Sequence, residues 1–190
     1  MRKAVFLPLL LAILAIGPAS DIGLGQDQPQ SATTAPADEN VKKGADLNAA
    51  RQYSQAESVL RAAVAANPAD PNAHLQLAVA LFEQNKIEEA GRELELAAPL
   101  QQGAEKQQAD FYRYRGAVYV KQGKWNEGVQ DLEKAIKLDP TKPYNHYYIG
   151  VAYGKQGRPD KMVEHLGMFL KLAPNAPEAP RVKALLASVQ

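Results

Sequence analysis

The sequence contains no cysteine. This absence excludes disulfide bonds, thiolate metal ligands, thiol catalysis and attachment of a lipid to an N-terminal cysteine. A chain without such cross-links must be held together by packing alone. Because 46% of the residues are hydrophobic and 23% are charged, the composition provides enough apolar side chains for a packed core.

A strong charge of either sign is also missing. The 22 basic and 21 acidic residues give a formal net charge of +1, and removal of a leader that carries Arg2 and Lys3 would leave the chain nearly neutral. A nearly neutral chain without a basic stripe lacks the electrostatic footprint of a nucleic-acid-binding protein. We therefore expect no nucleic-acid partner.

The apolar run at the N-terminus is too short for a membrane span. It extends over 4–16 and contains Pro8, whereas a transmembrane helix needs about 20 apolar residues. A short cationic start followed by such a run is typical of a secretory signal. Small residues predict cleavage after Ala19 or after Gly25, which makes 1–25 the signal peptide.

This signal predicts export to the periplasm or the extracellular space. In the alternative interpretation the segment is retained as an anchor, and the protein is the accessory subunit of a membrane complex. A membrane contact is expected only in that case.

The rest of the chain divides into a linker and a helical region. Residues 26–40 are rich in Pro, Gln, Ser, Thr and Ala without apolar periodicity, which predicts a flexible linker. Beyond it, apolar residues recur at spacings of three and four in segments that end at Gly, Asn or Pro. That pattern predicts an all-α protein.

Segments of the helical region recur after 34 residues. YVKQGKW at 119–125 returns as YGKQGRP at 153–159, and KLDPTKP at 137–143 returns as KLAPNAP at 171–177. A fixed period of this length is the signature of a helical-repeat array, in which stacked units bury a continuous core.

The period and its residue pattern resemble the tetratricopeptide repeat (TPR) family. Each unit has a small residue at the position of the family's glycine and a leucine at the position of its phenylalanine. The small residues are Gly44, Ala78, Gly116 and Gly150, and the leucines are Leu60, Leu94, Leu132 and Leu166. The resemblance implies an all-α, right-handed α-solenoid of about four TPR helical hairpins plus a C-terminal capping helix.

The register sets the boundaries of the repeats. The array is expected to span 41–176, with repeats at about 37–70, 71–104, 109–142 and 143–176. Between the second and third repeats the spacing stretches from 34 to 38 residues. Four residues make about one helical turn, so we expect a longer helix that begins near Ala104. Residues 177–190 have apolar side chains at helical spacing and are expected to form the cap.

The sequence has no pattern typical of catalysis or metal binding. His74, His146 and His165 are isolated, without a second His or Cys at metal-ligand spacing. His74 and His146 share one repeat position, so we expect both to be packing residues. Phosphate loops and nucleophile elbows are also missing. We expect no catalytic residue, cofactor, metal or small-molecule substrate; an enzyme with an unrecognised site is the alternative.

The resemblance implies that the first helices of the hairpins line a concave groove. Their side chains that are not used inside a hairpin are the candidates for contact with a partner. These are Leu75, Val79, Phe82, Arg113, Ala117, Val120, Tyr144, Tyr147 and Val151. A mostly apolar groove favours an amphipathic helix or an extended apolar peptide as ligand.

The sequence is therefore interpreted as a monomeric, non-catalytic scaffold or assembly factor that binds a protein or peptide. Alternatively, the groove residues are covered by neighbouring repeats or by the linker.

Overall fold

The computed structural model describes residues 37–189. The predicted signal peptide and most of the predicted linker lie outside these residues. Within 37–189 every element is a helix, which confirms the all-α prediction. None of these helices has the length and hydrophobicity that a bilayer crossing requires.

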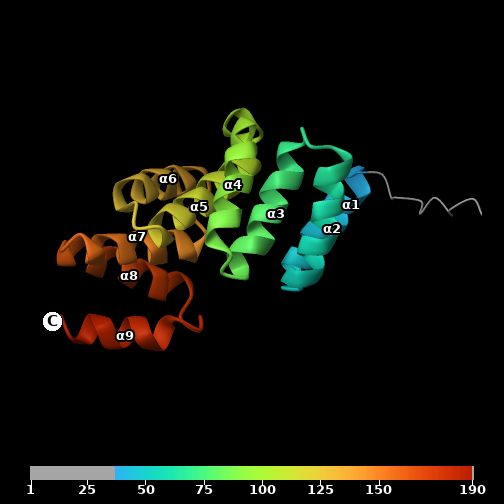
Figure 1. The fold of residues 1–190 in the computed structure, drawn as a ribbon. Helices are drawn as coiled ribbons and strands as arrows, with labels where there is room; N and C mark the ends of the chain where they lie inside the picture. Colours follow the sequence, from blue (N-terminus) through green and yellow to red (C-terminus); the bar gives the residue numbers. More distant parts are fainter. Residues whose placement is uncertain (1–36, 190) are drawn as a thin grey trace, which may run out of the picture. The chain divides into compact units, whose positions relative to one another are not determined.

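The α-helices pair as four hairpins followed by a single helix (Figure 1). The hairpins are α1 (Ala37–Ala49) with α2 (Tyr53–Ala66), α3 (Pro71–Glu83) with α4 (Ile87–Leu96), α5 (Glu105–Lys121) with α6 (Trp125–Leu138), and α7 (Pro143–Lys155) with α8 (Pro159–Leu172). A 3-10 helix, η1 (Ala98–Gln102), follows α4, and α9 (Ala179–Ala187) ends the array. Since α1 begins at Ala37, residues 37–40 of the predicted linker are helical.

All four hairpins turn in the same way. The second residue after each first helix has a left-handed backbone: Arg51 (φ 59°), Asn85 (φ 62°), Gly123 (φ 79°) and Gly157 (φ 69°). The next residue donates its backbone N–H to a carbonyl five residues back, as Lys124 does to Tyr119. This 6→1 bond is the Schellman arrangement that ends a helix and reverses the chain.

Small residues let the two helices of a hairpin approach closely. A Cβ atom added at Gly116 on α5 would lie 2.7 Å from Cγ of Leu132 on α6. One added at Gly128 on α6 would lie 2.6 Å from a methyl group of Val120. Larger side chains at either glycine would therefore push α5 and α6 apart.

The four-residue insertion between the second and third repeats lengthens α5. This helix has 17 residues, whereas α3 and α7 have 13 each. It begins directly after Ala104, as predicted. The added turn is therefore at the N-terminal end of α5, where η1 fills the connection from α4.

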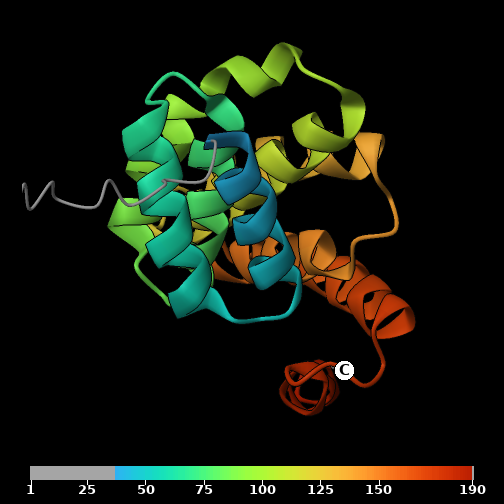
Figure 2. The same ribbon diagram turned by 90° about the vertical axis from the view of Figure 1, so that its right-hand side faces the viewer.

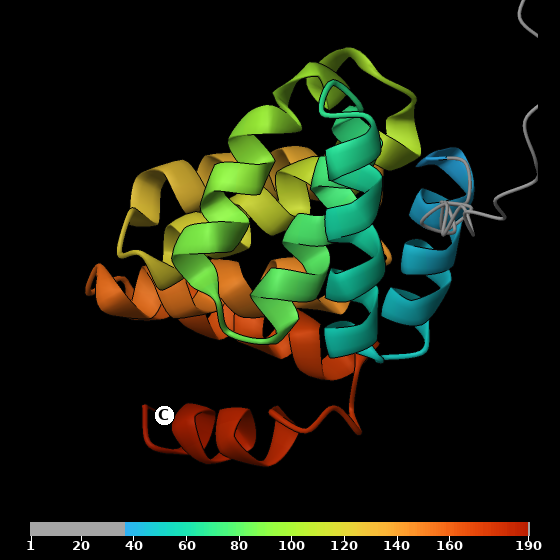
Figure 3. The same ribbon diagram turned by 45° about the vertical axis from the view of Figure 1, so that its right-hand side comes forward.

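Successive hairpins pack through their first helices, α1 with α3, α3 with α5 and α5 with α7. The second helix of each hairpin also packs against the first helix of the next. Figure 2 turns the α1–α2 hairpin toward the viewer, and Figure 3 shows α9 beside α8 at the other end. The helix α9 packs against α8 but, unlike the earlier first helices, has no backbone contact with the preceding first helix, α7.

Candidate functional site

Neighbouring repeats cover most of the predicted groove residues. The exposed fractions are 1% for Leu75, 8% for Val79, 7% for Phe82, 1% for Ala117 and 3% for Val120. Phe82 on α3 packs edge-on against Tyr114 of α5 and Tyr148 of α7, with ring centroids 5.7 and 5.9 Å apart. The prediction that they line an open groove is wrong for Leu75, Val79, Phe82 and Ala117, because the stacked first helices bury them. For these four residues the alternative, coverage by neighbouring repeats, is correct. Val120 is also buried, but it lies at the edge of a pocket.

Arg113 is engaged within its own repeat. Its Nη2 lies 2.7 Å from Oδ1 of Asp110, and its guanidinium stacks 4.3 Å from the ring centroid of Tyr114. A partner that used Arg113 would have to compete with both contacts. Arg113 is therefore a weak candidate for a free binding group.

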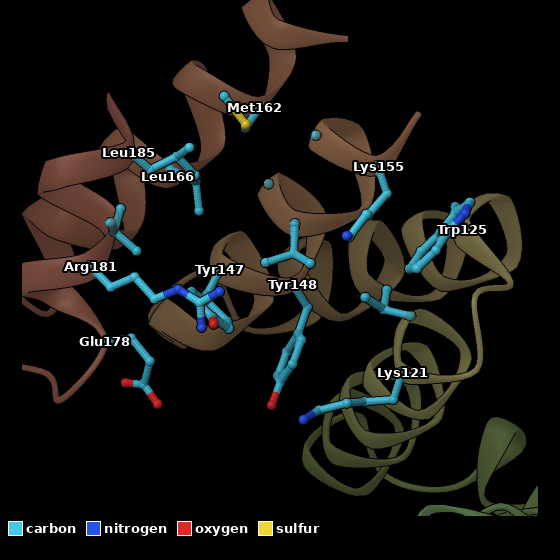
Figure 4. A pocket seen from close by; sticks show the side chains of 15 residues that line it. Lys121, Trp125, Tyr147, Tyr148, Lys155, Met162, Leu166, Glu178, Arg181 and Leu185 are labelled. Atoms are coloured by element: carbon cyan, nitrogen blue, oxygen red, sulfur yellow. The ribbon is translucent and has the colours of Figure 1, made fainter. Parts of the chain in front are cut away.

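The remaining candidates, Tyr144, Tyr147 and Val151, lie on α7 and are partly exposed. Tyr147 and Val151 line a cavity of about 600 Å³, which we call the C-terminal pocket. Its lining comes from the end of α5 and start of α6 (Val120, Lys121, Trp125), from α7 (Tyr147, Tyr148, Gly150, Val151, Gly154, Lys155), from α8 (Met162, Leu166) and from the α9 region (Glu178, Arg181, Val182, Leu185). Figure 4 shows these side chains.

The pocket exists because α9 does not cover α7. In the earlier repeats the next first helix occupies this space, as α5 does beside α3. The sequence enlarges the gap, since Gly154 stands at the repeat position of Phe82 and Val120. The backbone of Gly154 is exposed, whereas Phe82 and Val120 are buried.

Aromatic rings form the floor of the pocket. The Tyr147 ring lies 5.2 Å from that of Phe169 and 5.3 Å from that of Tyr148. The Tyr144 hydroxyl donates to Oε2 of Glu178 at 2.7 Å, which ties α7 to the start of α9. Burial and this hydrogen bond raise the pKa of Tyr144 to about 12, and burial raises the pKa of Tyr148 as well. Both hydroxyls are therefore neutral at physiological pH.

The rim of the pocket is mainly cationic. Lys121, Lys155 and Arg181 are exposed and form no ion pair within the part of the chain that the structure describes. The acidic group of the rim, Glu178, accepts the hydrogen bond from Tyr144. A carboxylate of a ligand would thus meet unpaired cations at the rim and an apolar, aromatic floor beneath them.

The contribution of α9 to the pocket was not predicted from the sequence, because Arg181 and Leu185 fall in the segment that was expected to form only a cap. Leu185 is 42% exposed and faces the pocket. Apolar residues at helical spacing predict that the cap is a helix. They do not show whether this helix packs on both α7 and α8 or on α8 alone. The packing of α9 therefore decides where the site lies.

Two of the three histidines meet in the structure. His74 is buried and bridges Oε2 of Glu93 (2.7 Å) and the carbonyl of Pro68 (2.9 Å), which is the expected packing role. By contrast, His146 Nδ1 lies 3.2 Å from His165 Nδ1, so the expectation that these two are isolated is wrong. Burial lowers the pKa of both rings. In each pair the two residues are 19 positions apart, and at this spacing residues on the two helices of one hairpin face each other.

No cluster of three or more His, Asp or Glu side chains within residues 37–189 could hold a metal ion. The C-terminal pocket itself contains lysine, arginine, tyrosine and one glutamate, without a histidine or an activated hydroxyl. Its arrangement is suited to binding a ligand.

Models of the tetratricopeptide repeat match the chain at residues 47–110, 116–157 and 144–176. A structure of MamA (AMB-1) has a TM-score of 0.62 and 23% identity, covering 80% of this chain and 88% of that chain. A structure of MamA from Desulfovibrio magneticus RS-1 has a TM-score of 0.58 and 18% identity, covering 76% of this chain and 79% of that chain. A structure of the APC/C hetero-tetramer Cut9-Hcn1 has a TM-score of 0.69 and 20% identity, covering 81% of this chain and 30% of that chain. At this identity the likeness establishes the fold. The comparison with curated proteins found no match.

Proposed function

The chain belongs to the tetratricopeptide repeat family, and on that premise we propose that it is a non-catalytic scaffold that binds an apolar, acidic segment of a partner protein in the C-terminal pocket. Stacked helical repeats present extended surfaces for protein binding. The observation that carries the proposal is the pocket of about 600 Å³ that α7, α8 and the α9 region line together with the turn between α5 and α6.

The apolar part of the ligand follows from the floor. Tyrosine side chains that are partly buried and held by ring contacts are typical anchors of protein interfaces. Tyr147 is held in this way by Tyr148 and Phe169. A pocket of this volume lies within the range of about 300–1,000 Å³ that is usual for ligand sites. It therefore suits a few apolar side chains of a peptide.

The acidic part of the ligand follows from the rim. Lys121, Lys155 and Arg181 supply positive charge that no described side chain neutralises by an ion pair. Complementary charge steers association and selects among partners. Three cations on a chain of net charge +1 are too few for a nucleic-acid surface, so an acidic protein segment is the better fit.

The enzyme alternative has less support. Catalysis by acid and base requires a group whose pKa lies near the working pH. Burial raises the pKa values of Tyr147 and Tyr148, the tyrosines that line the pocket, so both are neutral, and the pocket lining has no histidine. These features favour binding over chemistry.

Export of a monomeric scaffold is the second part of the proposal, and it is supported by the leader pattern of the sequence. N-terminal sequencing of the protein from its native compartment tests it. Cleavage after Ala19 or Gly25 is expected, whereas an intact Met1 would favour a retained anchor in a membrane complex.

Selection from a displayed peptide library on the immobilised protein tests the binding site. The expected peptides combine apolar residues with Asp, Glu or a terminal carboxylate. Leu185→Glu should abolish their binding in a fluorescence anisotropy assay. Leu96→Glu is the matched control, because Leu96 is 55% exposed on α4 and does not line the pocket.

A second pair of variants tests the charge of the ligand. Lys155→Glu should weaken binding of a selected peptide, and the loss should shrink at high salt because added ions screen the interaction. Lys137→Glu changes an exposed lysine outside the pocket and should have little effect. Selection of basic peptides, or equal effects of Leu185→Glu and Leu96→Glu, would refute the pocket as the binding site.

A further inference from the structure

His146 on α7 and His165 on α8 face each other across the last hairpin. Their Nδ1 atoms are 3.2 Å apart, their ring centroids 5.3 Å, and the ring planes are tilted by 34°. Neither ring has another hydrogen-bond partner among the described residues. Both side chains are partly exposed. The two nitrogens therefore point at one another in a place that a small solute can reach.

In repeats 2 and 3 the second-helix position equivalent to His165 holds an acid. In repeat 2 His74 pairs with the carboxylate of Glu93, and the same position of the second helix in repeat 3 is Asp131, held by Arg115. Repeat 4 alone among these three has imidazoles at both positions. With His165 in place of the carboxylate, two imidazole nitrogens face each other where repeat 2 has an imidazole and a carboxylate.

The geometry of the pair matches that of two imidazoles on one metal ion. Zinc–nitrogen bonds are about 2.0–2.1 Å long, so two nitrogens of a tetrahedral site are about 3.3 Å apart. For the same bond length and the observed nitrogen separation, the ring centroids would be about 5 Å apart. The observed values of 3.2 and 5.3 Å need only a small rotation of the rings. The ion would replace the direct contact between the two nitrogens.

We propose that His146 and His165 form a two-histidine binding site for a divalent transition metal ion such as Cu²⁺ or Zn²⁺. Imidazole suits these ions, and Cu²⁺ is the tightest binder of the divalent series at a given nitrogen site. Mg²⁺ and Ca²⁺ are excluded, because they prefer oxygen ligands. Two protein ligands leave positions on the ion for water. Glu164, the acid beside His165, is held by Lys161 at 2.7 Å.

A metal at this position would join α7 to α8 next to the pocket, because Tyr147 and Leu166 are the sequence neighbours of the two histidines and both line it. Anything that binds the folded state alone stabilises it. The ion should therefore raise the melting temperature of the protein through its last hairpin.

Titration calorimetry on chelator-treated full-length protein tests the proposal with Cu²⁺ and Zn²⁺, and with Mg²⁺ as the negative control. The wild type should bind one Cu²⁺ per chain and melt at a higher temperature with the ion. The variant pair is His146→Tyr, which copies Tyr112 at the same position of repeat 3, and His165→Gln. Each should weaken this binding at least about tenfold. Lys161→Ala, which leaves both histidines in place, should retain it.

Pulsed electron paramagnetic resonance on the Cu²⁺ complex gives a readout that does not depend on the variants. Coupling to the remote nitrogens of two imidazoles is expected. Absence of one-to-one binding to the wild type, or unchanged binding by His146→Tyr and His165→Gln, would overturn the proposal. Coupling to a single imidazole, or to backbone nitrogen alone, would also overturn it.

Discussion

The first helices of repeats 2 and 4 present the same repeat positions to very different surroundings. Leu75 and Val79 of α3 are buried, whereas Tyr147 and Val151 at the equivalent positions of α7 are partly exposed. The difference comes from the neighbour, because α5 packs against α3 but α9 leaves α7 uncovered. An apolar face on a repeat is therefore core or binding surface according to what stacks on it.

The variant with the largest expected effect is on α3, the buried first helix of repeat 2. Phe82→Ala should lower the free energy of unfolding by about 3–5 kcal/mol, because it leaves a cavity between α3, α5 and α7. Leu132→Ala, which empties a fully buried site between α5 and α6, is the reference and should cost about 2–5 kcal/mol. Urea unfolding measures both. A much smaller cost for Phe82→Ala than for Leu132→Ala would return Phe82 to the set of partner-facing residues.

The second prediction concerns α7, the partly exposed first helix of repeat 4. Tyr147→Ala should weaken binding of a selected peptide by about 1–3 kcal/mol, as expected for an interface anchor. That range corresponds to a loss of about 5- to 150-fold in affinity. Its cost in stability should be well below that of Phe82→Ala, because Tyr147 is partly exposed. If binding is unchanged while stability falls as far as it does in Phe82→Ala, then Tyr147 is a core residue.

The third prediction compares repeat 4 with repeat 3 at one buried position. Phe111 of α5 is fully buried, and Asn145 at the same position of α7 is 1% exposed with neither its amide nitrogen nor its amide oxygen hydrogen-bonded. A buried polar group without a partner is costly. Asn145→Leu should therefore raise the free energy of unfolding by about 1–2 kcal/mol in urea. A lower value would mean that the amide has a partner, such as a bound water.

The smallest expected change in stability is electrostatic and concerns α2, in the first hairpin of the array. Glu57 on α2 accepts hydrogen bonds from Lys86 at 2.7 Å and from Arg61 at 2.8 Å. Although burial raises the pKa of Glu57, the hydrogen bonds from Lys86, Arg61 and Gln84 outweigh it and lower the pKa to about 2.

The charged carboxylate of Glu57 should therefore stabilise the fold above its ordinary pKa of 4.5, and this contribution should be lost as the pH falls from about 4.5 to about 2. Urea unfolding of the wild type and of Glu57→Gln at several pH values isolates the effect. The difference between the two proteins should shrink toward pH 2. If the difference in the free energy of unfolding is the same at every pH, the charge of Glu57 does not contribute to stability.

Local spacing in the sequence was enough to predict the helices, the hairpins and the added turn of α5. Gly116 opposite Leu132 and the 34-residue period are short-range signals that the fold preserves. Burial between repeats was harder to predict, because it depends on how closely one hairpin packs on the next. Phe82 was placed on the correct face of α3, but its cover by Tyr114 and Tyr148 comes from two other repeats.

The site depends on a feature that the pattern does not encode, which is the angle at which the cap leaves the array. Arg181 and Leu185 reach the pocket because α9 packs on α8 and not on α7. The meeting of His146 and His165 was in principle predictable, since residues 19 apart face each other in each hairpin, as His74 and Glu93 do. Spacing rules for metal ligands on one helix do not detect such a pair.

Protection of a single thiol shows whether a partner occupies the pocket beside α9. The chain has no native cysteine, so Leu185→Cys and Leu96→Cys each introduce one reactive group at a leucine that is 42% or 55% exposed. Alkylation rates are measured with and without a selected peptide at saturation. The peptide should slow alkylation at position 185 at least about tenfold and leave the rate at position 96 unchanged. Equal rates at position 185 with and without the peptide would show that the pocket is not the binding site.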